Sequence, residues 1–117
     1  MAPSLRILVV EDEMTVALMI EDMLLDLGHE VVALAMRVGS ALRIAEAAEI
    51  DFALLDINLD GCLSFPVADV LRRRGVRFAF ASGYGSAGLA AAYRRDAMIR
   101  KPFDQQTLQR AIEGLSA

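Results

Sequence analysis

The sequence predicts an α/β fold: a parallel sheet with helices packed on both of its faces. Short apolar runs alternate along the chain with stretches in which apolar residues recur at helical spacing. The apolar runs are nearly continuous, which is typical of strands buried on both faces. With 117 residues, 56% of them hydrophobic, the chain can bury its own core, so one domain is expected over residues 1–117.

The first part of the chain is expected to form strand, helix, strand and helix. Residues 5–10 are the first apolar run, and the helical stripe that follows ends at Gly28. Residues 30–35 are expected to form the second strand, and residues 38–48 the second helix. His29 comes directly after the glycine that ends the first helix, so we expect it at the surface.

The second part continues the alternation. Residues 52–55 predict a third strand that runs directly into Asp56, and residues 77–81 and 97–100 predict the fourth and fifth. Consecutive strand–helix units of this kind favour a parallel sheet with right-handed connections. Ligands of such sheets bind at the carboxyl ends of the strands.

The remaining helices have clear ends. Apolar residues at 67–71 mark the third helix, and the arginines at 72–74 are expected to complement its dipole before a capping glycine. The segment after Ser82 is rich in Gly and Ala, so a helix there would be weak. The last helix is marked by residues 108–115 and is expected to be capped near Asp104.

Polar side chains follow the strands where a site is expected. They are Glu11, Asp12, Asp56, Ser82 and Lys101. Crowded carboxylates repel one another unless a cation neutralises them, and Mg²⁺ prefers oxygen ligands and often a phosphate. Asp carboxylates can accept phosphoryl groups.

These residue types predict a division of roles at a magnesium-dependent phosphoryl-acceptor site. Asp56 is expected to be the acceptor, and Glu11 and Asp12 to hold Mg²⁺ with it. Lys101 would pair with one phosphoryl oxygen, and Ser82 would donate a hydrogen bond to another.

Charge and composition restrict the partners. The formal net charge is -4, which argues against direct nucleic-acid binding. No apolar run is long enough to span a membrane. Cys62 is the only cysteine, which suits a reducing compartment, and a cytoplasmic location is expected.

Four motifs together resemble the signature of response-regulator receiver domains of two-component systems. They are VVEDE at 9–13, LLDINL at 54–59, SGY at 82–84 and KPF at 101–103. The resemblance covers essentially the whole chain. FASGYG at 80–85 also resembles the "FAT GUY" subgroup, with Ser82 in place of the usual Thr.

The resemblance implies a flavodoxin-like (βα)5 fold with strand order 2-1-3-4-5. It implies a backbone carbonyl ligand at Asn58 and a cis bond between Lys101 and Pro102. The phosphoryl donor would be a phosphohistidine of a histidine kinase or histidine phosphotransfer protein. Such a domain is not an enzyme in the ordinary sense, because it catalyses only its own phosphorylation and dephosphorylation.

The resemblance also bears on output. Phosphorylation is expected to act on an unknown downstream protein, through a homodimer, or as a phosphate sink. Receivers commonly carry an aromatic ring in the fifth strand, but residues 98–100 have none. Tyr84 is expected to replace it as a switch residue, with Pro102 as the other switch position.

Several alternatives start from the same residues. The chain could be a receiver fragment of a larger regulator or hybrid kinase, or a nucleotide-binding module that uses the 83–88 glycine loop. An aspartate-based phosphatase of the haloacid-dehalogenase type would need a second Asp where Asn58 stands. The run from Asp56 to Gly61 matches half of a calcium-binding EF-hand loop but lacks its final Glu.

Overall fold

The computed structural model describes residues 4–83, 91–93 and 95–114. A five-stranded parallel sheet has the order β2-β1-β3-β6-β7, which is 2-1-3-4-5 among the sheet's own strands. The strands span Arg6–Val10 (β1), Glu30–Ala35 (β2), Phe52–Asp56 (β3), Arg77–Ser82 (β6) and Met98–Arg100 (β7). The helices span Met14–Asp26 (α1), Val38–Ala47 (α2), Phe65–Arg73 (α3) and Gln105–Ile112 (α4). The predicted flavodoxin-like fold is confirmed.

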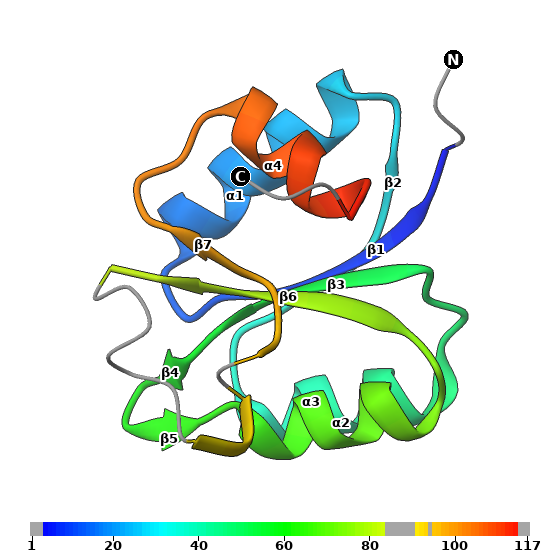
Figure 1. Ribbon diagram of the computed structural model, residues 1–117, viewed down its shortest axis with the longest axis vertical. Coiled ribbons are helices and arrows are strands. Elements are labelled where there is room, and N and C mark those ends of the chain that lie inside the picture. The colour runs from blue at the N-terminus through cyan, green and yellow to red at the C-terminus, as the bar shows by residue number, and fades with distance from the viewer. Residues whose placement is uncertain (1–3, 84–90, 94, 115–117) are drawn as a thin grey trace.

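The sheet is covered on both faces, α1 and α4 lying on one and α2 and α3 on the other (Figure 1). Successive residues of β1 point to opposite faces, as the pleat requires. Leu8 and Val10 join the core beneath α2 and α3, whereas Ile7 and Val9 join the core beneath α1 and α4. All four are at most 1% exposed, which explains the continuous apolar run.

The register of the strands brings their carboxyl ends together. β1 and β3 are in register at Val10 and Leu55. β6 and β7 are in register at Ser82 and Arg100. The residues that follow these positions therefore leave the sheet at the same edge, where the sequence predicted a site.

A short hairpin that the sequence analysis did not predict follows β3. Its strands are Asn58–Leu59 (β4) and Cys62–Leu63 (β5), and they pair antiparallel. The two turn residues, Asp60 and Gly61, have φ values of 51° and 88°. A two-residue hairpin turn of type I′ needs positive φ at both positions, and Asp-Gly is a preferred pair there.

The predicted ends of α1 and α3 and the predicted cap of α4 are confirmed, whereas α4 ends at Ile112 and residue 115 lies outside the described residues. Gly28 and Gly75 follow α1 and α3 with φ values of 90° and 74°, which glycine adopts without strain. Arg72 lies in the last turn of α3. The Asp104 side chain caps α4 by accepting a hydrogen bond from the Thr107 N–H at 2.8 Å.

Among the described residues before β7, Ala91–Tyr93 form a short 3-10 helix (η2). The Tyr93 ring stacks on Phe65 at the start of α3, with 4.3 Å between ring centroids. The Gly- and Ala-rich residues 84–90 lie outside the described residues, so the weak helix predicted there stays a prediction.

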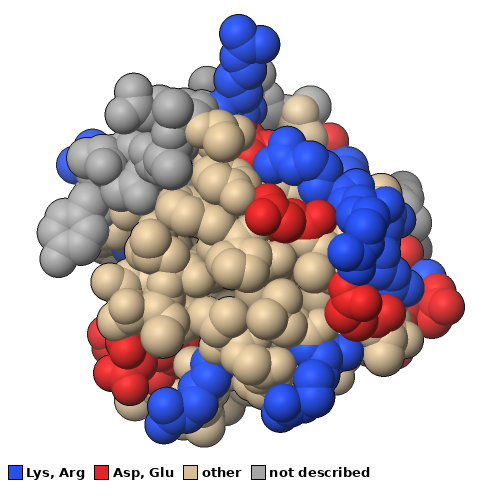
Figure 2. Space-filling view, turned by 90° about the horizontal axis from the view of Figure 1, so that it is seen from below, with Lys and Arg blue, Asp and Glu red and all other residues tan. Residues whose placement is uncertain are grey.

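The basic run at the end of α3 takes part in ion pairs. Arg72 contacts Asp96 at 2.6 Å, and Arg73 contacts Glu46. Figure 2, which views the α2 and α3 side, shows basic side chains beside acidic ones around an uncharged middle. Within the described ranges, no helix is long and apolar enough to cross a bilayer.

His29 is buried, so the expectation that it lies at the surface was wrong. Its Nδ1 accepts a hydrogen bond from the Leu5 N–H at 3.1 Å, which leaves the proton on Nε2, 3.0 Å from Oε1 of Gln109. The Arg77 guanidinium donates to the Ile112 carbonyl at 2.7 Å, also on α4. Two contacts therefore hold the second half of α4 against the amino ends of the strands.

We expect His29→Leu to lower the free energy of unfolding by about 1–3 kcal/mol, because it leaves the Leu5 N–H without its acceptor. Urea denaturation measures this loss. Gln109→Met is the control: it keeps the bond to Leu5 and should cost less. A His29→Leu protein as stable as the wild type would contradict the role assigned to this histidine.

Asp51 predicts a pH dependence of stability. Its carboxylate accepts hydrogen bonds from the Nε, Nη2 and main-chain N–H of Arg6, which lower its pKa from 3.8 to about 2. A depressed native pKa stabilises the fold above the ordinary pKa, and this contribution is lost as the pH falls from about 4 to about 2. Asp51→Asn should therefore be less stable than the wild type at neutral pH.

The difference between the two proteins should close near pH 2, as urea midpoints across this range would show. Glu49→Gln is the matched control, because the Glu49 carboxylate is 80% exposed and lies 3.8 Å from Arg6. A gap between Asp51→Asn and wild type that is independent of pH would rule out the ionised carboxylate as its source.

Candidate functional site

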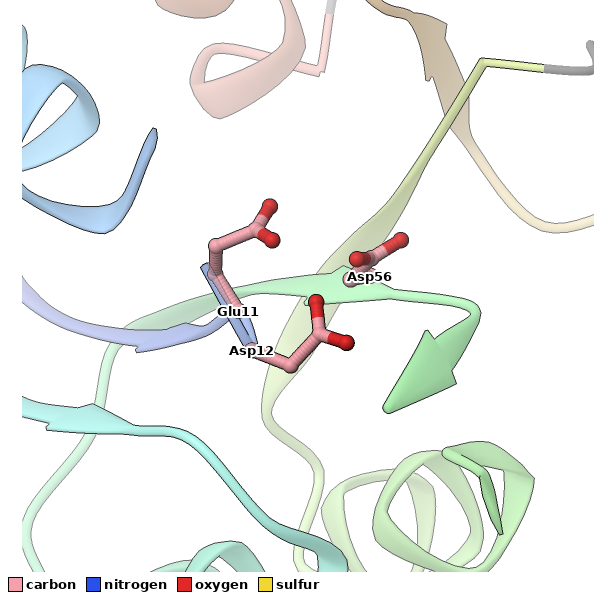
Figure 3. Close-up of side chains that lie close together, drawn as sticks. All are labelled: Glu11, Asp12 and Asp56. Atoms are coloured by element: carbon pink, nitrogen blue, oxygen red, sulfur yellow. The ribbon is translucent and has the colours of Figure 1, made fainter. Parts of the chain in front are cut away.

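Three carboxylates meet at the carboxyl edge of the sheet. Glu11 and Asp12 directly follow β1, and Asp56 is the last residue of β3. One oxygen from each lies within 4.8 Å of the others. Figure 3 shows the three side chains gathered between the ends of the two strands. The sequence therefore identified the residues that the fold brings together.

Lys101 lies against this acidic cluster from the end of β7. Its Nζ is 2.5 Å from Oε1 of Glu11 and 3.3 Å from Oδ2 of Asp56. Its backbone N–H donates to the Ser82 carbonyl at 2.9 Å, which fixes it beside β6. The expected cis bond between Lys101 and Pro102 is present.

Burial and the charge of Lys101 shift the pKa values of the carboxyl groups in opposite directions. Burial raises the pKa of the Glu11 carboxyl, and the Asp56 charge adds to this, although the hydrogen bond from Lys101 opposes it. Burial likewise raises the pKa of Asp56 against the attraction of Lys101. Burial alone would lower the pKa of Lys101, but the hydrogen bond to Glu11 and the charge of Asp56 outweigh it and raise that pKa.

The donor set suits a hard divalent cation. Three carboxylates face one ammonium group, so the cluster keeps a negative charge that Lys101 does not balance. Carboxylate oxygens are the ligands that Mg²⁺ prefers, usually with waters and a phosphate. The site can therefore hold such a cation and stabilise a phosphoryl group.

The hairpin after β3 contacts the cluster. The Asp60 N–H donates to Oδ2 of Asp12 at 2.9 Å. The side chain of Asn58 closes the turn, because its Oδ1 accepts from the Gly61 N–H at 2.8 Å. The side-chain amide of Asn58 is thus used in the turn. The expected role of its backbone carbonyl as a metal ligand stays a prediction.

The other predicted site residues lie around the same edge. Ser82 ends β6 and is 4% exposed, one strand away from Asp56. Pro102 is exposed. Tyr84 and the glycine loop at 83–88 fall outside the described residues from position 84 onward, so the switch role of Tyr84 and the nucleotide-binding alternative stay predictions.

Sequence reasoning missed Ser64. This serine is fully buried, and its hydroxyl donates to the backbone carbonyl of Asp56 at 2.5 Å. The signal that could have revealed the hairpin is the Asp60-Gly61 pair between two short apolar segments. No sequence pattern pointed to the hydrogen bond of Ser64, which joins residues eight positions apart.

The rejection of the calcium-binding loop agrees with the structure. β3, a strand, precedes Asp56 where an EF-hand would have a helix. The residues that follow fold back into the hairpin. The amide of Asn58 in the turn also gives no carboxyl group for the second acid of an aspartate-based phosphatase.

Comparisons with known proteins agree with this fold. A search of curated proteins found no significant match. SdrG from Sphingomonas melonis Fr1 is 36% identical, with a TM-score of 0.85, and the match covers 97% of both chains. The response regulator PhyR from Brucella abortus is 28% identical, with a TM-score of 0.81, over 95% of this chain and 46% of PhyR.

The receiver domain of a sensor histidine kinase from Pseudomonas aeruginosa has a magnesium ion coordinated in its active-site cleft. It is 25% identical, with a TM-score of 0.79, over 96% of this chain and 97% of that one. The profile of the response regulator receiver domain matches residues 7–113. None of these matches tests the resemblance to the FAT GUY subgroup. The chain belongs to the response regulator receiver domain family, the phospho-acceptor signalling switches of two-component systems.

Proposed function

We propose that this receiver accepts a phosphoryl group on Asp56 from a phosphohistidine of a histidine kinase or histidine phosphotransfer protein. The observation that carries the proposal is the position of the Asp56 carboxylate, which lies beside two other carboxylates and 3.3 Å from the Lys101 ammonium. A carboxylate in that setting is a nucleophile with a cation at hand for the incoming charge.

The transfer needs little covalent chemistry from the protein. A carboxylate oxygen of Asp56 forms a bond to phosphorus while the bond from phosphorus to the donor imidazole nitrogen breaks. The electron pair of the broken bond stays on that nitrogen, and the product is an acyl phosphate. Lys101 then pairs with a phosphoryl oxygen, and the Ser82 hydroxyl donates a hydrogen bond to another.

Mg²⁺ is the cofactor that these residues favour. Glu11, Asp12, Asp56 and the backbone carbonyl of Asn58 would hold it. When bound, the cation neutralises the crowded carboxylates and offsets charge on the phosphoryl oxygens. The negative charge that remains beside Lys101 supports this assignment.

The effect of phosphorylation on the binding surface is proposed to pass through Lys101. In the unphosphorylated protein its ammonium is held by Glu11 and Asp56. A phosphoryl group on Asp56 competes for that ammonium and changes the contacts at the start of the segment between β7 and α4. The altered surface would bind a downstream protein or a second copy of the chain.

The acceptor is tested with acetyl phosphate and Mg²⁺, followed by intact mass spectrometry. We expect one added phosphoryl group in the wild type, none in Asp56→Asn, and none after Mg²⁺ is removed with a chelator. Asp60→Asn is the matched control: Asp60 is a nearby acid with a 78% exposed side chain, and Asn tolerates its positive φ. Labelling of Asp56→Asn at the wild-type level would exclude Asp56 as the acceptor.

Lys101→Ala should separate phosphorylation from response. Loss of one charge-assisted contact slows phosphorylation, and we expect about a tenfold effect, equivalent to about 1.4 kcal/mol. The change in hydrogen exchange of β7 and α4 on phosphorylation should be lost, because the ammonium that senses the phosphoryl group is gone. Arg100→Ala removes the neighbouring exposed cation and should keep both properties. A full exchange response in phosphorylated Lys101→Ala would disprove the sensing role.

A further inference from the structure

The segment from Asp56 to Ser64, here called the acceptor loop, has its two ends hydrogen-bonded to each other and its turn hydrogen-bonded to Asp12. The Ser64 hydroxyl donates to the Asp56 carbonyl at 2.5 Å, and the Ser64 N–H donates to the Ile57 carbonyl at 2.9 Å. The turn residue Asp60 donates its N–H to Asp12. The loop therefore holds the carboxylate of Asp12 and the backbone carbonyl of Asp56.

The hydroxyl of Ser64 does not serve the helix that Ser64 precedes. A serine at this position normally accepts a hydrogen bond from the second or third residue of the helix. Here the second residue is Pro66, which has no N–H, and the N–H of Val67 is bound to the Ser64 backbone carbonyl at 2.9 Å. The side chain makes no capping bond to α3. Its hydroxyl is used for the Asp56 carbonyl instead.

We propose that Ser64 is a positioning residue for Asp56. The inference rests on the proposed acceptor function and adds the group that aims the acceptor. Asp56 is the last residue of β3, so the sheet no longer constrains the backbone that follows it. Ser64 is fully buried, and its hydroxyl fixes the backbone carbonyl of Asp56. Holding the backbone in this way restricts where the carboxylate lies, and small displacements of a reacting group slow transfer.

The expected effect is specific to the rate of the chemical step. Ser64→Ala should slow phosphorylation by acetyl phosphate, at saturating Mg²⁺ and donor, about fivefold, the usual range for one lost hydrogen bond. Ser64→Thr keeps the hydroxyl and should restore the rate. Ser64→Cys keeps a weak donor of similar shape and should lie between Ala and Ser.

Two controls separate positioning from a loss of stability. Ser40→Ala removes another serine hydroxyl that donates to a backbone carbonyl, that of Arg37 at 3.1 Å, and should leave the saturated rate unchanged. The wild type is also measured in enough urea to match the stability of Ser64→Ala. A purely structural role predicts equal rates for these two matched samples, whereas positioning predicts a slower rate in the variant.

A second readout does not depend on phosphorylation. The ¹³C signal of the Asp56 backbone carbonyl should move upfield in Ser64→Ala, and Mg²⁺ titration should show weaker binding. A wild-type saturated rate in Ser64→Ala, or an unmoved carbonyl signal, would overturn the proposal. If wild-type protein takes no phosphoryl group while the carbonyl signal and Mg²⁺ affinity still respond, the acceptor function fails and the positioning of Asp56 by Ser64 stands.

Discussion

The repulsion among Glu11, Asp12 and Asp56 is the constraint on which the rest of the site depends. The fold brings these carboxylates together at the end of two central strands and buries Glu11 almost completely. Burying a charged carboxylate beside other carboxylates is costly unless a group of opposite charge pairs with it. The Lys101 ammonium supplies that pairing from the end of β7, so the edge strand and the two central strands are joined by charge as well as by the sheet.

The same pairing makes the site responsive. Lys101 holds two acids while the cluster is unphosphorylated, and a more strongly anionic phosphoryl group in place of the Asp56 carboxylate would redistribute its contacts. The sheet beneath is packed on both faces and cannot yield easily. Rearrangement is therefore expected in the loops that follow the strands, where polar contacts such as that of Asp60 with Asp12 also hold the chain.

The positions of the strands, their burial on both faces and the polar residues that follow them could be predicted. These features depend on the local pattern of apolar residues. The hairpin Asn58–Leu63 was missed, although its Asp60-Gly61 turn is a local signal. His29 and Ser64 were beyond local reasoning. Gln109 and Asp56, their partners, are placed by the tertiary fold. A pattern of apolar residues shows which face is buried, but not which backbone group a buried polar atom will meet.

The hydrogen bonds described for α4 hold its two ends unequally. Its second half is pinned by Gln109 to His29 and by the Ile112 carbonyl to Arg77. Its first turn, capped by Asp104, follows only three residues after Lys101 and has no such pin among the contacts described for α4. The described hydrogen bonds therefore tie the second half of α4 to the amino edge of the sheet, where β1 begins, whereas the first turn, which follows Lys101, is held by the packing of Leu108 in the core.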